Sequence, residues 1–247
     1  MHRFFLPSIP PGPEEFPLDS GAARKICRVL RLGPGDEIFL WDEKGKEYRA
    51  RITKAAGRRV YVKVLEEKEP AGEPPLRIAL VQGIPKGDKI EFIIQKATEL
   101  GVWSIHPVVT ERTVVQIPPE RRAARLKRWQ AIAAEAARQC GRASIPVVGE
   151  IAPFEGLREA LEPGARKLIF WEGEGYGLKE YLRSTAPSSP VYLFIGPEGG
   201  FSPREVEAVL AGGGVSVSLG PRVLRTETAG LIGLSLILYE WGDLGGG

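Results

Sequence analysis

The sequence predicts an α/β fold with a parallel sheet, preceded by a small β-barrel domain. Three observations support this prediction. The first third alternates short β-forming runs with turn residues. Residues 67–75 are charged, rich in proline and without periodicity, which is typical of a linker. Beyond them, apolar strands alternate with helical patterns, and that alternation is the signature of a parallel sheet covered by helices. The 247 residues are long enough for two such domains.

The first third is expected to be built mainly of strands. Runs of β-branched and aromatic residues occur at 37–41, 47–52 and 59–65. Turn residues separate or precede these runs at 33–36, 43–45 and 56–57. Residues 22–30 are the one helical stretch here. Short strands at regular spacing favour a small barrel.

Beyond the linker we expect a regular alternation of elements. Strands are predicted at 77–84, 102–109, 145–148, 167–171, 191–195 and 215–218. Helices are predicted at 88–101, 120–140, 154–161 and 178–183, after Ser202, and at 230–241. Asp88 with Glu91, and Ser202 with Glu205, have the spacing of a reciprocal capping box. The last helix is apolar almost all round, so it must be buried in the core or against another subunit.

The composition excludes several classes of protein. No apolar run reaches the ~18 residues that a membrane span needs, and the apolar stretch near Met1 is too short for a signal peptide. Two cysteines, Cys27 and Cys140, with two histidines, His2 and His106, are too few for a disulfide framework or a structural zinc cluster. We therefore expect a cytoplasmic protein with no membrane segment and no metal.

Positive charge is concentrated in the first third of the chain. Residues 24–63 hold 12 basic and 5 acidic side chains, whereas the whole chain has a net charge of +3. A basic segment attracts a polyanion because binding releases counterions, so nucleic acid is the first partner to test. A solvated basic face without a partner fits the charge as well.

A glycine-rich loop, residues 196–201, follows the apolar strand 191–195. Ligands of open parallel sheets bind where strands end, and glycines let the backbone approach a ligand closely. Neither the dinucleotide fingerprint nor the phosphate-binding loop is present, and Glu198 would repel a phosphate. The loop therefore suits a phosphate-free nucleoside better than NAD or ATP, which disfavours an NAD-type oxidoreductase. A tight connection without any ligand fits the spacing equally well.

A second polar loop, residues 219–229, leads into the apolar last helix. It places Arg222, Arg225 and Glu227 beside apolar sequence, where polar groups usually have a function. Alternatively, Thr226 caps the helix and Glu227 interacts favourably with the helix dipole. That reading leaves the two arginines unexplained.

The two loops together closely resemble the bacterial ribosomal RNA small subunit methyltransferase E family. The similar segments are residues 196–202, 219–229, 86–102, 111–113, 135–142, 3–5, 29–31 and 35–36. The resemblance implies a PUA-like RNA-binding β-barrel domain at residues 1–72. The resemblance also implies a SPOUT methyltransferase domain at residues 73–247. In this class of domain the carboxyl-terminal part of the chain forms a deep trefoil knot.

The resemblance also implies an activity and partners. These enzymes methylate N3 of a uridine in 16S ribosomal RNA, using S-adenosylmethionine. Related enzymes are homodimers, and the apolar last helix agrees with a buried two-fold interface. The substrate is either the RNA or the small ribosomal subunit. A non-catalytic RNA-binding module on the same scaffold is the alternative from a different class of function.

The resemblance assigns residues to the methyl-donor site and to RNA binding. The donor site is expected to comprise Ile195, Gly196, Pro197, Glu198, Gly199, Gly200, Leu219, Gly220, Leu224, Arg225, Glu227, Thr228 and Ala229. RNA contacts are expected from Arg3, Arg24, Lys25, Arg28, Arg31, Arg49, Arg51, Arg112, Gln139 and Arg142.

The acceptor sets a further chemical demand. Uridine N3 is a poor nucleophile until it loses its proton, and a fixed guanidinium beside the resulting anion would lower that cost. Arg225 is the first candidate for this catalytic role and Arg222 the second. The general base stays open, with Glu198 and Glu227 as the nearest carboxylates. His106, beside Pro107 in a predicted strand, is expected to be a packed residue.

Overall fold

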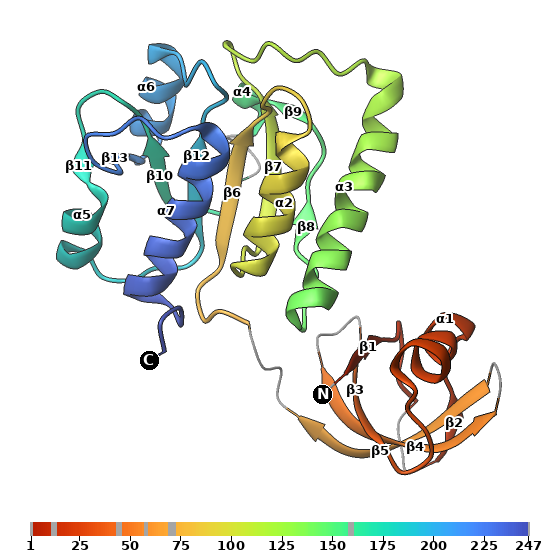
Figure 1. Cartoon of the computed structure of the whole chain (residues 1–247). Helices are drawn as coiled ribbons and strands as arrows, with labels where there is room; N and C mark the ends of the chain where they lie inside the picture. The colour runs from red at the N-terminus through yellow and green to blue at the C-terminus, as the bar shows by residue number, and fades with distance from the viewer. Residues whose placement is uncertain are drawn as a thin grey trace. The chain divides into compact units, whose positions relative to one another are not determined.

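The computed structural model divides the chain into two compact units, drawn in Figure 1. The first comprises residues 1–73 with 137–144, and the second comprises residues 74–136 with 145–247. The structure describes residues 2–10, 14–42, 46–56, 59–68, 73–157 and 161–246. The predicted turn at 43–45, Gly57 and residues 69–72 of the predicted linker lie outside these ranges, as do residues 158–160 of a predicted helix.

The first unit is built on a five-stranded sheet with the order β1-β3-β4-β5-β2. Its strands are β1 (Arg3–Phe5), β2 (Phe16–Pro17), β3 (Glu37–Trp41), β4 (Glu47–Ala56) and β5 (Arg59–Lys68). The β1–β3 pair is parallel, and the other pairs are antiparallel. Alternating residues such as Ile38, Leu40, Ile52 and Val62 point into one hydrophobic core. The period-2 pattern therefore predicted β3 with its exact bounds, and β4 and β5 run a few residues longer.

One helical segment packs on this sheet. Helix α1 (Ser20–Arg24) continues into the π-helical turn η1 (Lys25–Leu30). The Asp19 carboxylate caps α1 by accepting the N–H groups of Gly21 and Ala22 at 2.7 and 3.0 Å. Ile26 is buried, and the basic side chains of the segment are exposed. The segment ends at Arg31, whose φ of 54° lies in the left-handed region.

The second unit contains an eight-stranded sheet in which every pair is parallel. The order is β11-β13-β10-β12-β6-β7-β8, and β9 pairs with β7. The strands are β6 (Ile78–Gly83), β7 (Ser104–Val109), β8 (Val147–Val148), β9 (Ala152–Pro153), β10 (Arg166–Phe170), β11 (Tyr176–Gly177), β12 (Val191–Ile195) and β13 (Val215–Ser218). The predicted α/β class with a parallel sheet is confirmed.

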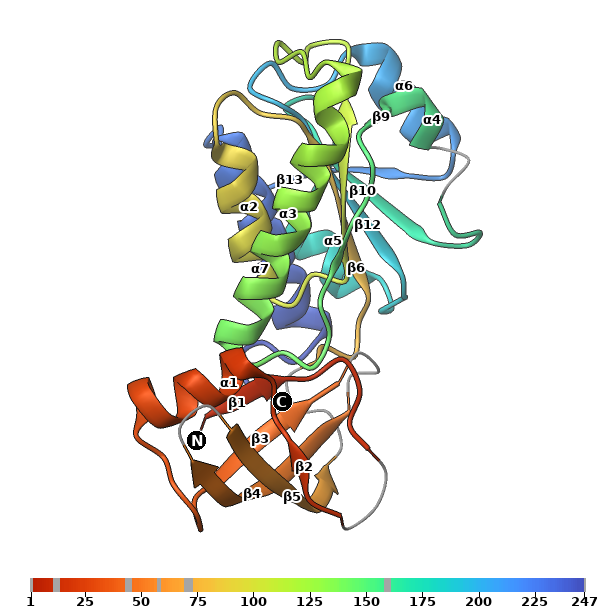
Figure 2. The same cartoon turned by 90° about the vertical axis from the view of Figure 1, so that its right-hand side faces the viewer.

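Helices cover both faces of this sheet (Figures 1 and 2). They are α2 (Lys89–Glu99), α3 (Pro119–Cys140), α4 (Phe154–Leu157), α5 (Leu178–Ser184), α6 (Pro203–Ala211) and α7 (Thr226–Trp241). Ile93 of α2, Trp129 of α3, Leu182 of α5 and Leu234 of α7 share one core. On the opposite face, α4 and α6 form a second core with Phe154 and Val206. No helix in the described part of the chain combines the length and apolarity of a membrane span.

The two predicted capping boxes have different outcomes. At α6, Glu205 accepts the Ser202 N–H at 2.8 Å and its own N–H donates to the Ser202 hydroxyl at 3.3 Å, which confirms the box. At α2 the prediction is wrong, because the Asp88 side chain makes no capping bond. Glu91 pairs instead with Arg128 of α3, at 2.6 Å from Nη2 to Oε2. A charge-assisted bond to a neighbouring helix replaces a local one.

Helix α7 begins at Thr226, four residues before its predicted start. One side is buried around Gly230, Leu234 and Ile237. Gly233 is required there, because a Cβ would lie 2.3 Å from a ring atom of Phe170. The other side leaves a stripe of apolar side chains exposed, which we call the α7 stripe: Ile232 at 41%, Leu236 at 43% and Tyr239 at 65%.

Candidate active site

The two polar loops of the sequence meet at one edge of the parallel sheet. Strands β6, β10, β12 and β13 are parallel, so their carboxyl ends lie on the same side. Thr226, the first residue of α7, donates from its hydroxyl to the carbonyl oxygen of Gly196 at 2.6 Å. Residues thirty positions apart are thereby joined, and the loops after β12 and β13 bound a single site.

The glycine loop folds back on itself and against β6. A Cβ on Gly196 would lie 2.8 Å from the backbone of Gly200, and a Cβ on Gly83 would lie 2.5 Å from the Pro197 ring. Gly200 has a φ of 68° and donates its N–H to the Pro197 carbonyl at 2.9 Å. Glycine is required at 83 and 196 because a side chain would overlap the neighbouring segment, and it is favoured at 200 because of the positive φ.

A lysine of α2 bridges carboxylates from both loops. Lys89 Nζ lies 3.0 Å from Glu198 Oε1 and 3.2 Å from Glu227 Oε2. Both oxygens of Glu198 also accept the backbone N–H of Lys86 at 3.2 Å. Partial burial raises the pKa of Glu198, but the hydrogen bonds from Lys89 and from backbone N–H groups outweigh it and lower the pKa overall. The hydrogen bonds to Glu198 and Glu227 raise the pKa of Lys89. The ionised forms of Glu198 and Lys89 are therefore both favoured.

Three guanidinium groups lie in or beside the loops. Arg112, from the loop after β7, donates from Nη1 to the Gly199 carbonyl at 2.9 Å. Its neighbour Glu111 donates a backbone N–H to Glu205 of α6 at 2.9 Å, which holds this loop in place. Arg222 and Arg225 are exposed, and neither of them forms an ion pair with another described residue. Both are therefore available to a substrate.

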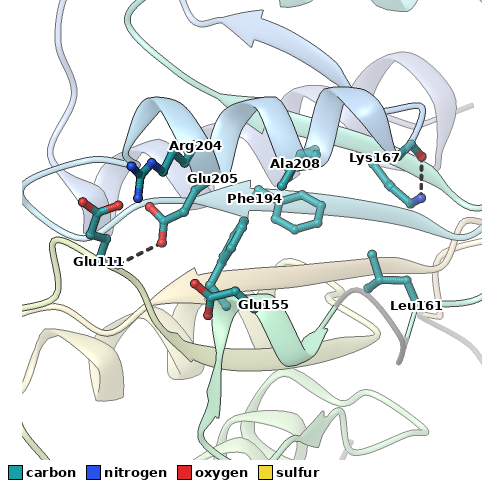
Figure 3. Close-up of a pocket in the computed structure, with 11 residues that line it drawn as sticks. Glu111, Glu155, Leu161, Lys167, Phe194, Arg204, Glu205 and Ala208 are labelled. Carbon is teal, nitrogen blue, oxygen red and sulfur yellow. Dashed lines mark hydrogen bonds between the residues drawn. The ribbon is translucent and has the colours of Figure 1, made fainter.

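A cavity of about 270 Å³ lies elsewhere, on the face covered by α4 and α6 (Figure 3). Phe154 and Phe194 form apolar walls, while Lys167 and Glu205 line it with charge. Those two charged groups are engaged by the protein itself: Lys167 donates to the Gly212 carbonyl at 2.7 Å, and Glu205 accepts from Glu111. Other charged side chains, among them Arg204, also line the cavity, so charge alone does not decide the place of the site. We place the site at the loops because they meet at the carboxyl ends of parallel strands.

The sequence did not lead us to assign three residues that the structure places at the site: Gln82, Lys89 and Thr226. Gln82 is fully buried and donates from Nε2 to the Thr226 hydroxyl at 2.8 Å. The signal was available, because Gln82 is the single polar side chain in the otherwise apolar strand β6. The alternative in which Thr226 caps the helix is wrong. The N-cap of α7 is Arg225, and the Thr226 hydroxyl binds Gly196 instead.

The residues expected to bind RNA fall into two groups. Arg24, Lys25, Arg28 and Arg31 are exposed on or directly after α1 and η1, and Arg112 and Gln139 are exposed too. In contrast, Arg49 and Arg51 form ion pairs with Glu37 at 3.2 and 2.8 Å.

Arg3 and Arg142 are held in the first unit. Arg3 lies 3.2 Å from Glu47, and Arg142 is 5% exposed and lies 2.8 Å from Glu73. Arg142 is buried, and the other three arginines, although partly or fully exposed, already have a carboxylate partner, so all four are less available to a phosphate. We therefore leave Arg3, Arg49, Arg51 and Arg142 out of the RNA surface proposed below.

His106 packs inside the second unit. Its Nε2 shares a hydrogen bond of 2.9 Å with the Ser104 hydroxyl, and its ring lies 6.1 Å from that of Tyr192. Burial lowers the pKa of His106. It is the packed residue that we expect from the sequence.

Comparison with known proteins gives consistent matches along the chain. A family model described as an RNA methyltransferase domain matches residues 72–238, and one described as an RNA methyltransferase PUA domain matches residues 26–65. The Ribosomal RNA small subunit methyltransferase E of Bacillus subtilis is 33% identical over 97% of each chain.

Solved structures agree with these matches. A Ribosomal RNA small subunit methyltransferase E from Neisseria gonorrhoeae, bound to S-adenosylmethionine, is 36% identical with a TM-score of 0.86, covering 98% of this chain and 99% of that one. A methyltransferase from Legionella pneumophila, also with S-adenosylmethionine, is 34% identical with a TM-score of 0.82, covering 98% of both. The chain belongs to the ribosomal RNA small subunit methyltransferase E family.

Proposed function

We propose that the protein transfers a methyl group from S-adenosylmethionine to N3 of a uridine in the 16S RNA of the small ribosomal subunit. The observation that carries the proposal is the joining of the glycine loop to the arginine loop through the Thr226–Gly196 hydrogen bond. Near-full-length similarity to methyltransferases crystallised with S-adenosylmethionine supports it. The finer choice of N3 rests on the family resemblance.

The loops fit the chemistry of the methyl donor. S-adenosylmethionine has a sulfonium centre and no phosphate, and when bound it supplies the activated methyl group. The glycine loop turns tightly at the end of β12, with Gly196 packed on Gly200, and glycines let a ligand approach such a backbone closely. The ionised Glu198 would repel a phosphate but not a sulfonium. The donor set is the one expected from the sequence, residues 195–200, 219–220, 224–225 and 227–229.

The arginines fit the demand of the acceptor. Once N3 has lost its proton, negative charge spreads over the two carbonyl oxygens of the uracil ring. An exposed guanidinium stabilises that charge as an oxyanion hole does. Arg225 is assigned first and Arg222 second. Glu198 is a poor general base because Lys89 holds it ionised with a lowered pKa, and Glu227 shares the same lysine.

The wider organisation follows from the same family. Residues 1–72 form a PUA-like RNA-binding barrel, and residues 73–247 form a SPOUT domain with a deep trefoil knot.

Two copies associate through the α7 stripe together with Phe92 of α2, which is 48% exposed. Helices α2 and α7 pack against each other, so these side chains can form one apolar surface. Because its substrate is ribosomal RNA of the small subunit, we place the protein in the cytoplasm.

The test is methyl transfer to small subunits that lack the modification. Purified protein is incubated with these subunits and a tritiated methyl donor, and the labelled nucleoside is identified by chromatography. We expect label in N3-methyluridine. RNA binding that weakens with salt but is accompanied by no transfer would instead support a non-catalytic RNA-binding module.

Replacing Gly196 by alanine is expected to weaken donor binding by about tenfold or more. The new Cβ would lie 2.8 Å from the Gly200 backbone. The backbone shift that such overpacking forces costs ~1–3 kcal/mol. Binding of S-adenosylmethionine is measured by calorimetry. Gly177→Ala is the matched control, because nothing lies within 4 Å of a Cβ there. Equal affinity of the two variants would contradict the assignment of the glycine loop.

The Lys89 bridge makes stability depend on pH. The pKa of Glu198 is lowered in the folded protein, so its stabilising contribution is present above the ordinary glutamate pKa. This contribution is lost as the pH falls from the ordinary glutamate pKa to below the lowered pKa of Glu198 in the folded protein. The melting temperature of wild type should therefore exceed that of Glu198→Gln at neutral pH, and the difference should shrink in acid. A difference that grows in acid would show that the pKa is raised instead.

A further inference from the structure

A buried glutamine connects strand β6 to both loops of the site. Gln82 donates from Nε2 to the Gly83 carbonyl at 2.9 Å and to the Thr226 hydroxyl at 2.8 Å. That hydroxyl donates in turn to the Gly196 carbonyl at 2.6 Å. Gln82 is 0% and Thr226 6% exposed. The bonds form one chain through the interior, from β6 through the start of α7 to the glycine loop.

The direction of each hydrogen bond in this chain is fixed by chemistry. A carbonyl oxygen only accepts, so the single hydroxyl proton of Thr226 must go to Gly196. The hydroxyl oxygen can then only accept from its other partner, which requires an N–H of Gln82. The Gly83 carbonyl also requires an N–H, which fixes the orientation of the amide. A serine at 226 can make the same two bonds, whereas a valine of equal shape makes neither.

This series of hydrogen bonds, together with Gly83, fixes one peptide group from two sides. The Gly196 carbonyl belongs to the planar peptide that precedes Pro197. Thr226 holds its oxygen, and Gly83, the neighbour of Gln82, approaches the Pro197 ring so closely that a Cβ would lie 2.5 Å away. Residues 82 and 83 therefore determine, through both contacts, where the glycine loop leaves the sheet.

The amide of Gln82 is retained despite an unsatisfied atom. Its Oε1 is buried and has no hydrogen-bond partner among the described residues. It faces α7, at 3.5 Å from where a Cβ on Gly230 would lie. An unpaired buried oxygen destabilises a fold, and an apolar side chain at this position would avoid that loss. The amide therefore has a role other than packing.

We propose that Gln82 and Thr226 are positioning residues of the methyl-donor site. They hold the glycine loop at a fixed place against the start of α7, where Arg225 and Glu227 lie, so that donor and acceptor groups keep their spacing. Neither residue needs to touch the donor. The inference rests on the proposed function and deepens it, because it names residues outside the two loops that set the geometry of the loops.

The test compares Thr226→Val with Thr226→Ser, and uses Gln82→Met and the double variant Gln82→Met/Thr226→Val. We measure the Kd for S-adenosylmethionine, kcat and the melting temperature. Thr226→Val should raise Kd by about tenfold, the effect of losing one hydrogen bond at the site, and should lower kcat. Thr226→Ser should restore both values to near wild type. The double variant should bind no more weakly than Thr226→Val, because both substitutions break one chain.

Ser235→Ala is the matched control. This hydroxyl is also on α7 and donates to the Leu231 carbonyl at 2.8 Å, without contact to the loops. It should leave Kd and kcat unchanged. A lower melting temperature for Thr226→Val with unchanged Kd and kcat would mean a purely structural role and would overturn the proposal. If Thr226→Val fails to fold, an unchanged Kd and kcat in Gln82→Met decides against it. Wild-type protein that binds no S-adenosylmethionine would overturn the proposed function instead.

Discussion

Arg225→Ala is expected to lower the rate of methyl transfer by about 10²–10³-fold, the effect of removing one charge-stabilising donor from an active site. The Arg225 side chain makes no capping bond at the start of α7 and is exposed, and no ion pair ties it to other described residues. Its removal therefore takes no interaction from the fold. The melting temperature should be unchanged, and so should the affinity for S-adenosylmethionine, because we assign Arg225 to the donor site through its backbone, which alanine keeps.

Two further variants sharpen this prediction. Arg225→Lys should recover only part of the rate, since an ammonium lacks the planar fork that binds two oxygens at once. Arg183→Ala is the matched control. Arg183 pairs with Glu240 at 3.4 Å near the other end of α7, about 21 Å along the helix from Thr226. Single-turnover transfer measures all three. Wild-type rates in Arg225→Ala would remove this arginine from the mechanism.

Neutralising the basic segment of the first unit is expected to weaken RNA binding strongly without affecting donor binding. In the triple variant Arg24→Gln/Lys25→Gln/Arg28→Gln, three exposed charges of α1 and η1 are lost. Each lost phosphate contact reduces the salt slope of log K by about 0.7–0.9. With three charges removed, the slope should therefore become shallower by about 2 to 3. The affinity should fall most at low salt. Arg31 is left in place because its φ of 54° tolerates few residues.

Arg49→Gln/Arg51→Gln is the control for that experiment. These arginines already pair with Glu37 and Glu66 on the sheet, so their removal should change the salt slope little. Titrations of small-subunit RNA over a range of salt concentrations compare the two variants. If the control loses as much affinity as the triple variant, the RNA surface includes the sheet face.

The sequence predicted the elements that depend on nearby residues. Strands β3, β12 and β13 have their predicted bounds, since an apolar pattern and flanking turns define each of them. The capping box at Ser202 formed because both partners lie within four residues. The same pattern at Asp88 failed because Arg128, nearly forty residues away, takes Glu91. The short strands β1, β2, β9 and β11 were missed, as each is held by pairing with a distant strand.

For this protein, the sequence by itself determined the α/β class, the family and the two loops, because these are written in local patterns and motifs. Only the tertiary structure decided how the loops meet. The contact of Gln82 with Thr226 joins residues 144 positions apart, and Lys89 reaches carboxylates of two loops that follow different strands. Such contacts depend on strand order in the sheet, which no local pattern encodes. They make Thr226 a link between the two loops, and not the helix cap that the sequence offered as an alternative.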